Sequence, residues 1–257
     1  MPAFRQKAKW ARRFLYPLRC VWPQVIRRHL TQKIVFEEQQ VHHQSAKSSR
    51  CYCEDPLLFV PRVLTKMHSI WVGLTYPFAS AGRKLDLDYR SQLSRARACR
   101  ISLGNSVSLR RNAWLNVATG ETDGEPVIVI EDNCAIGTDT IISAKNKIHV
   151  EPDVLIAQSV LIVDHNHAYE DIAVPIVEQG ITEGGRIRIG RGSWIARGAT
   201  IICPKGELTI GRNCVIAANS VVTRSIPDYS LVAGLPARII RQYDPETKTW
   251  RIGKTRG

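Results

Sequence analysis

The sequence lacks any apolar run long enough to cross a membrane. No stretch of 18 consecutive apolar residues occurs among the 257 positions, whereas a transmembrane helix needs about 20. The one candidate for a signal peptide, residues 14–26, is interrupted by Arg19, so it does not offer the continuous apolar segment that secretion requires. We therefore expect a cytoplasmic protein.

Cysteine pairs with metal-binding spacing are also missing. Of the seven cysteines, Cys51 and Cys53 are separated by one residue rather than the usual two or more. We expect reduced thiols and no structural metal. Glycine and proline, at 17 and 13 residues, are too few for a collagen-like or low-complexity chain, and the length is sufficient for a substantial core.

Acidic residues are scarce in the first hundred positions. Residues 1–100 contain 19 Lys or Arg and 6 Asp or Glu, whereas residues 101–257 contain 17 of each. We expect residues 1–66 to be a basic, poorly ordered extension that is dispensable for folding, and residues 67–100 to lead into the fold. The extension could be simply solvated, or it could contact anionic lipid at the inner face of the membrane. Nucleic acid is not an expected partner, because no recognised binding fold accompanies the charge.

A six-residue repeat occupies residues 101–226. Aliphatic residues recur in five triplets, and the spacing inside each triplet is six. The triplets are Leu103, Leu109 and Leu115; Ile130, Ile136 and Ile142; Val150, Ile156 and Ile162; Ile189, Ile195 and Ile201; and Ile210, Ile216 and Val222. Every spacing longer than six residues follows the third aliphatic residue of a triplet. The pattern predicts a parallel β-solenoid of about five triangular coils, with all insertions leaving from one edge.

Two further positions share this register. Three residues after the first two aliphatic positions of each coil stand turn-forming residues, which suit corners with left-handed backbone: Ser106, Asn112, Asn133, Asp139, Asp153, Ser159, Gly192, Gly198, Asn213 and Asn219. The next residue is always small, as a second inward position in a narrow prism requires. Cys134 and Cys214 fall on this position, so we expect them to pack in the core. Unrelated strands of a sandwich would not share a register.

The longest insertion, residues 163–188, contains the candidate catalytic group. His165 falls at a corner, where it cannot be a core residue. It is either a solvated loop residue or a general base, for which its ordinary pKa near 6.5 is suitable. His167 is a competing base. Asp164 either orients His165 or satisfies its own corner backbone.

These features resemble the hexapeptide-repeat acyltransferases, in particular the branch that O-acetylates sugars and surface polysaccharides. The resemblance covers about residues 95–242 and rests on the repeat, the histidine loop ending in Pro175 and Ile176, and the segments 189–195, 221–227 and 232–241. It implies a left-handed parallel β-helix with a C-terminal tail, residues 227–257, on the CoA side. It also implies a homotrimer with active sites between neighbours and acetyl-CoA as the acyl donor.

The resemblance also implies roles for particular residues. His165 matches the catalytic base, and a backbone N–H near Ala196 and Arg197 would hold the oxyanion. Ser143 and Trp194 match acceptor-side positions, although Trp194 could instead support the trimer interface. The remaining matches lie along the path of CoA and are Ala218, Thr223, Arg224, Arg238 and Arg241. Each arginine alone could equally be a solvated charge.

The chain departs from the family pattern in three places. Ala196 stands where glycine is usual, Arg197 where a small residue is common, and residues 203–207 form a corner three residues longer than usual. Two other functions remain open. One is a zinc enzyme of the carbonic anhydrase type using His149, His165 and His167; the other is a non-catalytic basic binding scaffold. The leading prediction is an acetyl-CoA-dependent O-acetyltransferase acting on a sugar or surface-polysaccharide hydroxyl.

Overall fold

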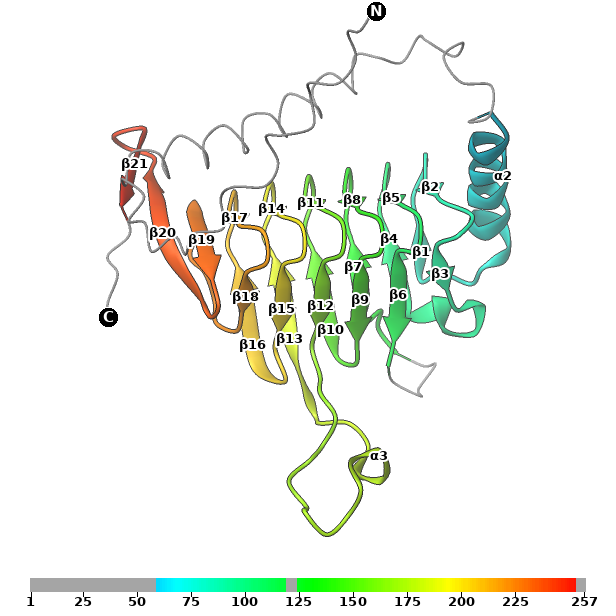
Figure 1. The fold of residues 1–257 in the computed structure, drawn as a ribbon. Helices are drawn as coiled ribbons and strands as arrows, with labels where there is room; N and C mark the ends of the chain where they lie inside the picture. The colour runs from blue at the N-terminus through cyan, green and yellow to red at the C-terminus, as the bar shows by residue number, and fades with distance from the viewer. Residues whose placement is uncertain (1–58, 119–123, 253–257) are drawn as a thin grey trace, which may run out of the picture. The chain divides into compact units, whose positions relative to one another are not determined.

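Three parallel sheets form the faces of a triangular prism. The computed structural model describes residues 59–118 and 124–252, in which the chain winds as a left-handed parallel β-helix, as expected (Figure 1). The basic residues 1–58 lie outside the described residues. Strand follows strand around the prism, so that neighbours within each sheet are three strands apart in sequence. We call the three sheets faces A, B and C.

The strands are short because each face is only a few residues wide. Face A contains β1 (Ser80–Ala81), β4 (Ile101–Leu103), β7 (Ile128–Ile130), β10 (Lys147–Val150), β13 (Gly184–Ile189) and β16 (Lys205–Ile210). Face B contains β2 (Asp86–Leu87), β5 (Ser108–Leu109), β8 (Ala135–Ile136), β11 (Leu155–Ile156), β14 (Trp194–Ile195) and β17 (Val215–Ile216). Face C contains β3 (Gln92–Leu93), β6 (Trp114–Val117), β9 (Ile141–Ala144), β12 (Leu161–Val163), β15 (Thr200–Ile202) and β18 (Val221–Val222).

The C-terminal tail extends face B. Strand β19 (Ser230–Gly234) adds to β17 in parallel, and β20 (Ala237–Asp244) and β21 (Thr249–Ile252) then continue antiparallel. Tyr243 contacts Trp250 with ring centroids 5.5 Å apart. The tail thus covers the last coil with a small antiparallel sheet.

One coil precedes those expected from the repeat. Ala81, Leu87 and Leu93 lie in register with Leu103, Leu109 and Leu115, within the segment 67–100 in which we expected only a lead-in. Their spacing is also six. The coil does not stand out in the sequence because Ala81 is small and Lys84, rather than a typical turn former, takes the left-handed corner with φ of 58°.

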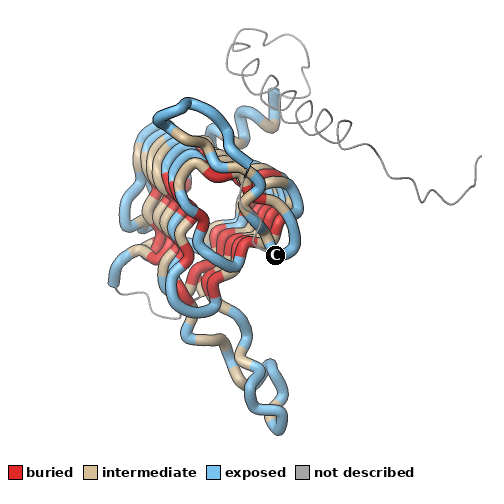
Figure 2. Tube along the Cα trace, turned by 90° about the vertical axis from the view of Figure 1, so that its left-hand side faces the viewer, coloured by how far each residue is buried: buried red, intermediate tan, exposed pale blue. Residues whose placement is uncertain are grey.

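The interior and corners of the prism follow the predicted register. All fifteen aliphatic residues of the five triplets are buried, and buried residues line the inside of the coils when the stack is viewed along its length (Figure 2). All ten predicted corner residues have positive φ, between 50° and 69°. Cys134 and Cys214 are buried in the core, and burial raises the pKa of the Cys134 thiol to about 11. Their expected packing role is confirmed.

Helix α2 (Phe59–Thr75) covers the N-terminal end of the prism. Val72 packs into the core, and the Ser69 hydroxyl accepts a hydrogen bond from the Leu87 N–H at 2.8 Å. The helix begins eight residues before Met67, inside the segment 1–66 that we expected to be poorly ordered. A truncation starting at Met67 would therefore remove half of the helix. No described helix is both long and apolar enough to cross a bilayer.

The insertions leave from one edge, as predicted. Each edge is named by the two faces that it joins. At the CA edge, the chain passes from face C of one coil to face A of the next. The 3₁₀ helix η2 (Arg95–Arg100) and the loop 163–188, with its short helix α3 (Ile176–Gln179), both lie there. The loop extends well beyond the prism (Figures 1 and 2).

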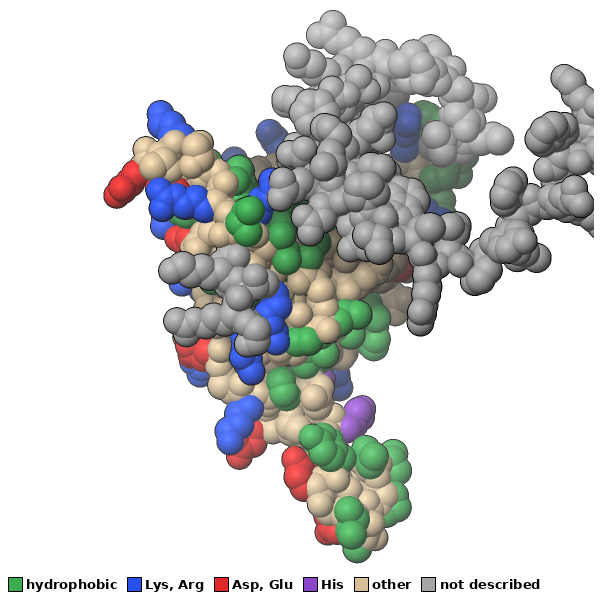
Figure 3. Space-filling view, turned by 60° about the vertical axis from the view of Figure 1, so that its left-hand side comes forward, with side chains coloured by type: hydrophobic (Ala, Val, Ile, Leu, Met, Phe, Trp, Pro, Cys, Tyr) green, Lys and Arg blue, Asp and Glu red, His purple; other side chains and the backbone are tan. Residues whose placement is uncertain are grey.

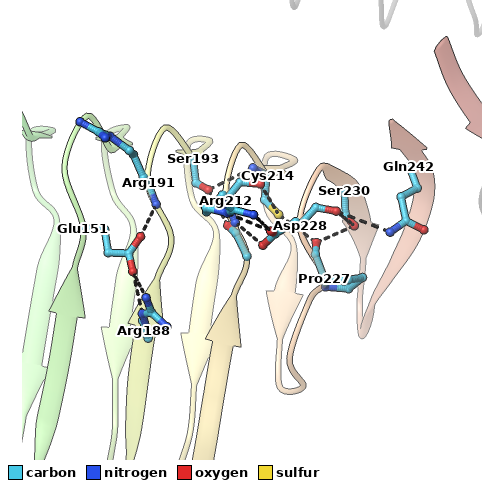
Figure 4. Close-up of polar contacts among 11 residues, drawn as sticks. Glu151, Arg188, Arg191, Ser193, Arg212, Cys214, Pro227, Asp228, Ser230 and Gln242 are labelled. Carbon is cyan, nitrogen blue, oxygen red and sulfur yellow. Dashed lines mark hydrogen bonds and ion pairs between the residues drawn. The ribbon is translucent and has the colours of Figure 1, made fainter. Parts of the chain in front are cut away.

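The AB edge instead carries ion pairs that connect successive coils (Figure 4). Glu151 accepts hydrogen bonds from the Arg188 guanidinium and the Arg191 N–H, at 2.7 and 2.8 Å. Asp228 accepts from the Arg212 N–H at 2.8 Å and from its guanidinium at 2.7 Å. These contacts add charge-assisted hydrogen bonds to the backbone ladder.

Acidification should weaken the Asp228 contact. The Arg212 backbone N–H and guanidinium lower the pKa of the Asp228 carboxyl, so its stabilisation is present above the ordinary aspartate pKa of about 4 and is lost as pH falls further. We expect Asp228→Asn to reduce stability at pH 7 by about 1 kcal/mol or less, because the pair is partly solvated. Urea unfolding from pH 7 to pH 3 should show this difference shrinking below pH 4. A difference independent of pH would contradict the assignment.

Candidate active site

The two ends of the long loop meet beside the CA edge. The Gly185 N–H donates to the Asp164 carbonyl at 2.6 Å. Further out, the Thr182 N–H donates to the Asn166 carbonyl at 2.8 Å, and the Asn166 N–H donates to the Thr182 hydroxyl at 3.0 Å. The loop therefore has a closed base at the point where the candidate catalytic residues lie.

Asp164 is the buried anchor of this base. Its carboxylate accepts hydrogen bonds from three consecutive backbone N–H groups of the preceding coil, those of Lys145, Asn146 and Lys147, at 2.8, 2.9 and 3.0 Å. Its side chain is completely buried. Hydrogen bonds offset the cost of burying a carboxylate, and here the donors come from the neighbouring coil rather than from its own corner.

The same carboxylate contacts His165. The His165 Nδ1 lies 2.9 Å from the Asp164 Oδ1. Because an ionised carboxylate can only accept, Nδ1 must carry the proton, and in the neutral ring Nε2 is then an unprotonated acceptor. The imidazole is 12% exposed, so its position is restricted while it still reaches solvent. A histidine held in this way is suited to accept a proton through Nε2.

His167 has a different environment. It is exposed and takes part in an isolated antiparallel bridge with Ile181 inside the loop. Among the residues that the structure describes, no carboxylate is hydrogen-bonded to its ring. The geometry therefore favours His165 over His167 as the oriented histidine.

Ser143 lies one coil away from the end of β12, in register with Val163. Its hydroxyl accepts a hydrogen bond from the Asn116 side-chain amide at 2.8 Å. Our sequence reasoning did not select Asn116. A signal was available, since Asn116 directly follows Leu115 as Ser143 directly follows Ile142, and the two residues are paired in the sheet. Together they place an amide and a hydroxyl on face C near His165.

The CA edge continues past His165 toward the C-terminus. Cys203 lies in the next coil, where its N–H donates to the Val163 carbonyl at 3.0 Å. Burial raises the pKa of the Cys203 thiol, and the Asp164 charge adds to this effect. Thr223 and Arg224 follow β18 in the last coil and are exposed. Two of the predicted CoA contacts therefore share an edge with the histidine.

The BC edge carries another set of predicted residues. Arg197 and Ala218 stack in adjacent coils, since Trp194 pairs with Val215. The Ala196 N–H donates to the Ile216 carbonyl at 2.9 Å and the Gly198 N–H donates to the Gln158 carbonyl at 3.1 Å. The Ala196 N–H is therefore already used by the backbone ladder. Arg197 lies between these two donors and is the remaining candidate.

Face B and the tail hold the other predicted residues. Trp194 is half-buried at the start of β14, Arg238 is exposed on β20, and Arg241 is half-buried on the same strand. None of them lies on the CA edge. Trp194 shares its register position on face B with Val215, Leu231 and Arg241.

Within one chain, the two edges are far apart. Face C separates them, and five residues of extended chain from Gly198 to Cys203 correspond to about 16 Å. The structure thus brings His165, Asp164 and Ser143 together, but it does not bring them to Arg197 or Ala218. The candidate residues of one chain therefore lie on two different edges.

The histidines of the repeat region do not converge. His149 lies on face A with its Nε2 2.5 Å from the Glu131 carboxylate. In residues 59–118 and 124–252, no group of three or more His, Cys, Asp and Glu side chains is placed to hold a metal ion.

No family model matches the chain, but individual relatives do. It is 35% identical over 133 residues to the Escherichia coli K12 protein WbbJ, which is named as a lipopolysaccharide biosynthesis O-acetyl transferase; the match covers 49% of this chain and 66% of WbbJ. It is 37% identical over 110 residues to the Mycobacterium tuberculosis protein Rv3034c, named as an acetyltransferase, covering 43% and 35%. The matched segment thus spans less than two thirds of either relative.

Solved structures share the fold. The N-acyltransferase AntD from Bacillus cereus, in complex with dTDP and 3-hydroxybutyryl-CoA, superposes with a TM-score of 0.55 at 17% identity, covering 71% of this chain and 90% of AntD. The molecule is thus a parallel β-helix with a histidine loop on one edge. The matched segment is similar in sequence to proteins that are named as acetyltransferases.

The base of the loop leaves no room for a side chain at position 185. A Cβ added to Gly185 would lie 2.5 Å from the Cys203 carbonyl oxygen and 2.9 Å from the Gly206 carbonyl oxygen. We expect Gly185→Ala to displace the loop base and to lower the free energy of unfolding by about 1–3 kcal/mol. Urea unfolding would measure the loss.

Gly73→Ala is the matched control, because a Cβ at Gly73 in α2 meets nothing within 4 Å. It should be neutral or stabilising by up to about 1 kcal/mol. Equal stability of the two variants would contradict the close approach of the loop base to the next coil.

Proposed function

We propose that this protein is an acetyl-CoA-dependent O-acetyltransferase that acts on a hydroxyl of a sugar or surface-polysaccharide intermediate, with His165 as general base. The observation that carries the proposal is the buried Asp164 carboxylate holding Nδ1 of His165 at 2.9 Å. This contact leaves Nε2 as a proton acceptor at the surface of the prism. The names of the two relatives agree with acetyl transfer, and that of WbbJ with a glycan acceptor.

The reaction balances with these groups. His165 Nε2 removes the proton of the acceptor hydroxyl while its oxygen attacks the thioester carbonyl of acetyl-CoA. The carbonyl oxygen becomes negatively charged, and the Arg197 N–H is the donor that would stabilise it. The C–S bond then breaks, the acetyl ester forms, and the CoA sulfur takes the proton from the imidazolium. Asn116 and Ser143 would bind hydroxyls of the acceptor beside His165.

The donor would lie along the C-terminal half of the prism. Thr223 and Arg224 on the CA edge, together with Ala218 and Arg238 on the other side of face C, are exposed. Exposed guanidinium groups suit phosphate oxygens because they donate two parallel hydrogen bonds. We assign Arg224, Arg238 and Arg241 to the phosphate and nucleotide part of CoA.

A homotrimer completes the site. If three prisms stand side by side with face C of each toward a common axis, the CA edge of one copy lies beside the BC edge of the next. His165 of one copy then approaches Arg197 and Ala218 of its neighbour, with Trp194 lining the cleft between them. The arrangement is closed, so every copy contributes the same two edges.

The outward side chains of the three faces support this orientation. Those of face C are largely apolar and include Trp114, Ile141, Leu161, Val163, Ile202 and Val221. Those of face A are largely charged or polar and include Lys147, His149, Arg186, Arg188, Glu207 and Thr209. Apolar surface of this extent on a soluble solenoid is typical of an interface between subunits.

The base assignment is tested by replacing each histidine of the loop. His165→Ala should reduce acetyl transfer by about 10² to 10⁴, the usual contribution of a general base, while CoA binding measured by calorimetry stays unchanged. His167→Ala, the matched control two residues away, should retain most of the rate. A His165→Ala variant that keeps more than about a tenth of the activity would move the role to His167 or to another mechanism.

The trimer is tested on face C. The native mass from light scattering should be three times the chain mass of 28.9 kDa, and Leu161→Glu should reduce it to that of one chain, because three carboxylates would be buried together. Activity should be lost in parallel. Val129→Glu on the outward side of face A is the control and should remain trimeric. An active monomer would contradict a site shared between copies.

A further inference from the structure

Helix α2 presents an apolar face that nothing in the described structure covers. Eight of its large apolar side chains are between 37% and 82% exposed, and they are Phe59, Val60, Val63, Leu64, Met67, Ile70, Trp71 and Leu74. At 100° per residue they fall within an arc of about 140°. Ser69 and Val72, the buried residues of the helix, lie on the opposite side. The apolar face therefore points directly away from the prism.

The charged side chains of the helix itself are all basic. The helix contains Arg62, Lys66 and His68 and no Asp or Glu. On the helical wheel, Lys66 falls about 20° outside one end of the apolar arc, and Arg62 falls about 60° outside the same end. Residues 1–58, which precede the helix directly, contain 11 Lys or Arg and 4 Asp or Glu. An apolar arc bordered by basic residues is complementary to the surface of an anionic bilayer, where acyl chains lie beneath negative headgroups.

We propose that α2 is an interfacial membrane helix that docks the N-terminal end of the prism on anionic lipid. Trp71 and Phe59 would insert at the headgroup boundary, with Arg62 and Lys66 at phosphate level. With 17 residues the helix is about 25 Å long, and it does not qualify as a membrane span, so it would lie in the plane of the surface. A second copy of this chain fits less well, because two such positively charged ends would repel.

The proposed trimer would strengthen the docking. Three prisms related by a three-fold axis have their N-terminal ends on the same side, so three α2 faces would meet the bilayer together. The second and third contacts are then intramolecular, which raises overall affinity without any new contact. This step alone rests on the proposed function; binding by α2 itself does not require acetyl transfer.

Vesicle flotation of the full-length protein tests the proposal. The probes are vesicles of phosphatidylcholine alone and vesicles with about a third of phosphatidylglycerol. Wild type should float with the anionic vesicles. The double variant Met67→Glu with Trp71→Glu should bind about tenfold less, because the apolar insertion is lost. The matched control, Ile172→Glu with Val177→Glu, changes two exposed apolar residues in the loop 163–188 and should bind as wild type does.

Two results would overturn the proposal. Wild-type protein that fails to float would mean that the apolar face is covered by this chain or by another protein. An α2 variant that floats like wild type would mean that the basic residues alone are responsible. Light scattering adds a further check: a lipid-free wild-type mass that falls by half in the α2 variant would show that a second copy covers the face. Acetyl transfer by the α2 variant, measured with a soluble acceptor, separates docking from catalysis.

Discussion

The whole molecule depends on a sharp corner that few residues can form. At the AB and BC edges the chain turns with one residue in the left-handed region, and in five successive coils this residue is Ser, Asn, Asp or Gly. The side chains then connect the coils: the Asn112 amide donates to Asp139 at 2.9 Å, and that of Asn133 donates to Asp153 at 3.2 Å. The corner thus sets both the triangular shape and the stacking.

Glycine enters this pattern where a neighbour leaves no room. A Cβ added at Gly192 would lie 2.4 Å from the Asn213 side-chain oxygen, and one at Gly198 would lie 2.2 Å from that of Asn219. Both glycines also have positive φ, 69°. The residue at one corner is therefore determined by the residue stacked on it, which is why the repeat shows a class of residue at each corner rather than one residue.

The third corner, at the CA edge, does not require a left-handed turn residue, and the candidate site lies at this edge. At the CA edge the chain leaves and returns with loops of different length. Asp164 closes the base of the longest loop by accepting hydrogen bonds from three backbone N–H groups. The same carboxylate also contacts Nδ1 of His165. Asp164 therefore both stabilises the base of the loop and orients the imidazole ring. The Asp164 carboxylate thus serves both the fold and the proposed chemistry.

The repeat and its corners were predictable because they depend on local spacing. The first coil was not, because Ala81 and Lys84 satisfy the geometry without the residue types that mark it elsewhere. The pairing of Asn116 with Ser143 could be predicted only if the length of the insertion between their coils were known. The hydrogen bond from the Ala196 N–H to the Ile216 carbonyl depends on how the next coil stacks. These contacts depend on the three-dimensional fold. A sequence motif indicates only that a residue lies near the candidate site.

The two edges that carry the candidate residues are separated by the width of face C. The Asp164 carboxylate and the His165 ring meet within one chain, whereas Arg197, the proposed backbone donor, and Ala218 lie across face C. A largely apolar face cannot remain solvated without cost, so the proposed trimer would bury face C and complete the proposed site in the same association. In the proposed trimer, the interface that removes apolar surface from water is also what would place donor and base within reach of each other.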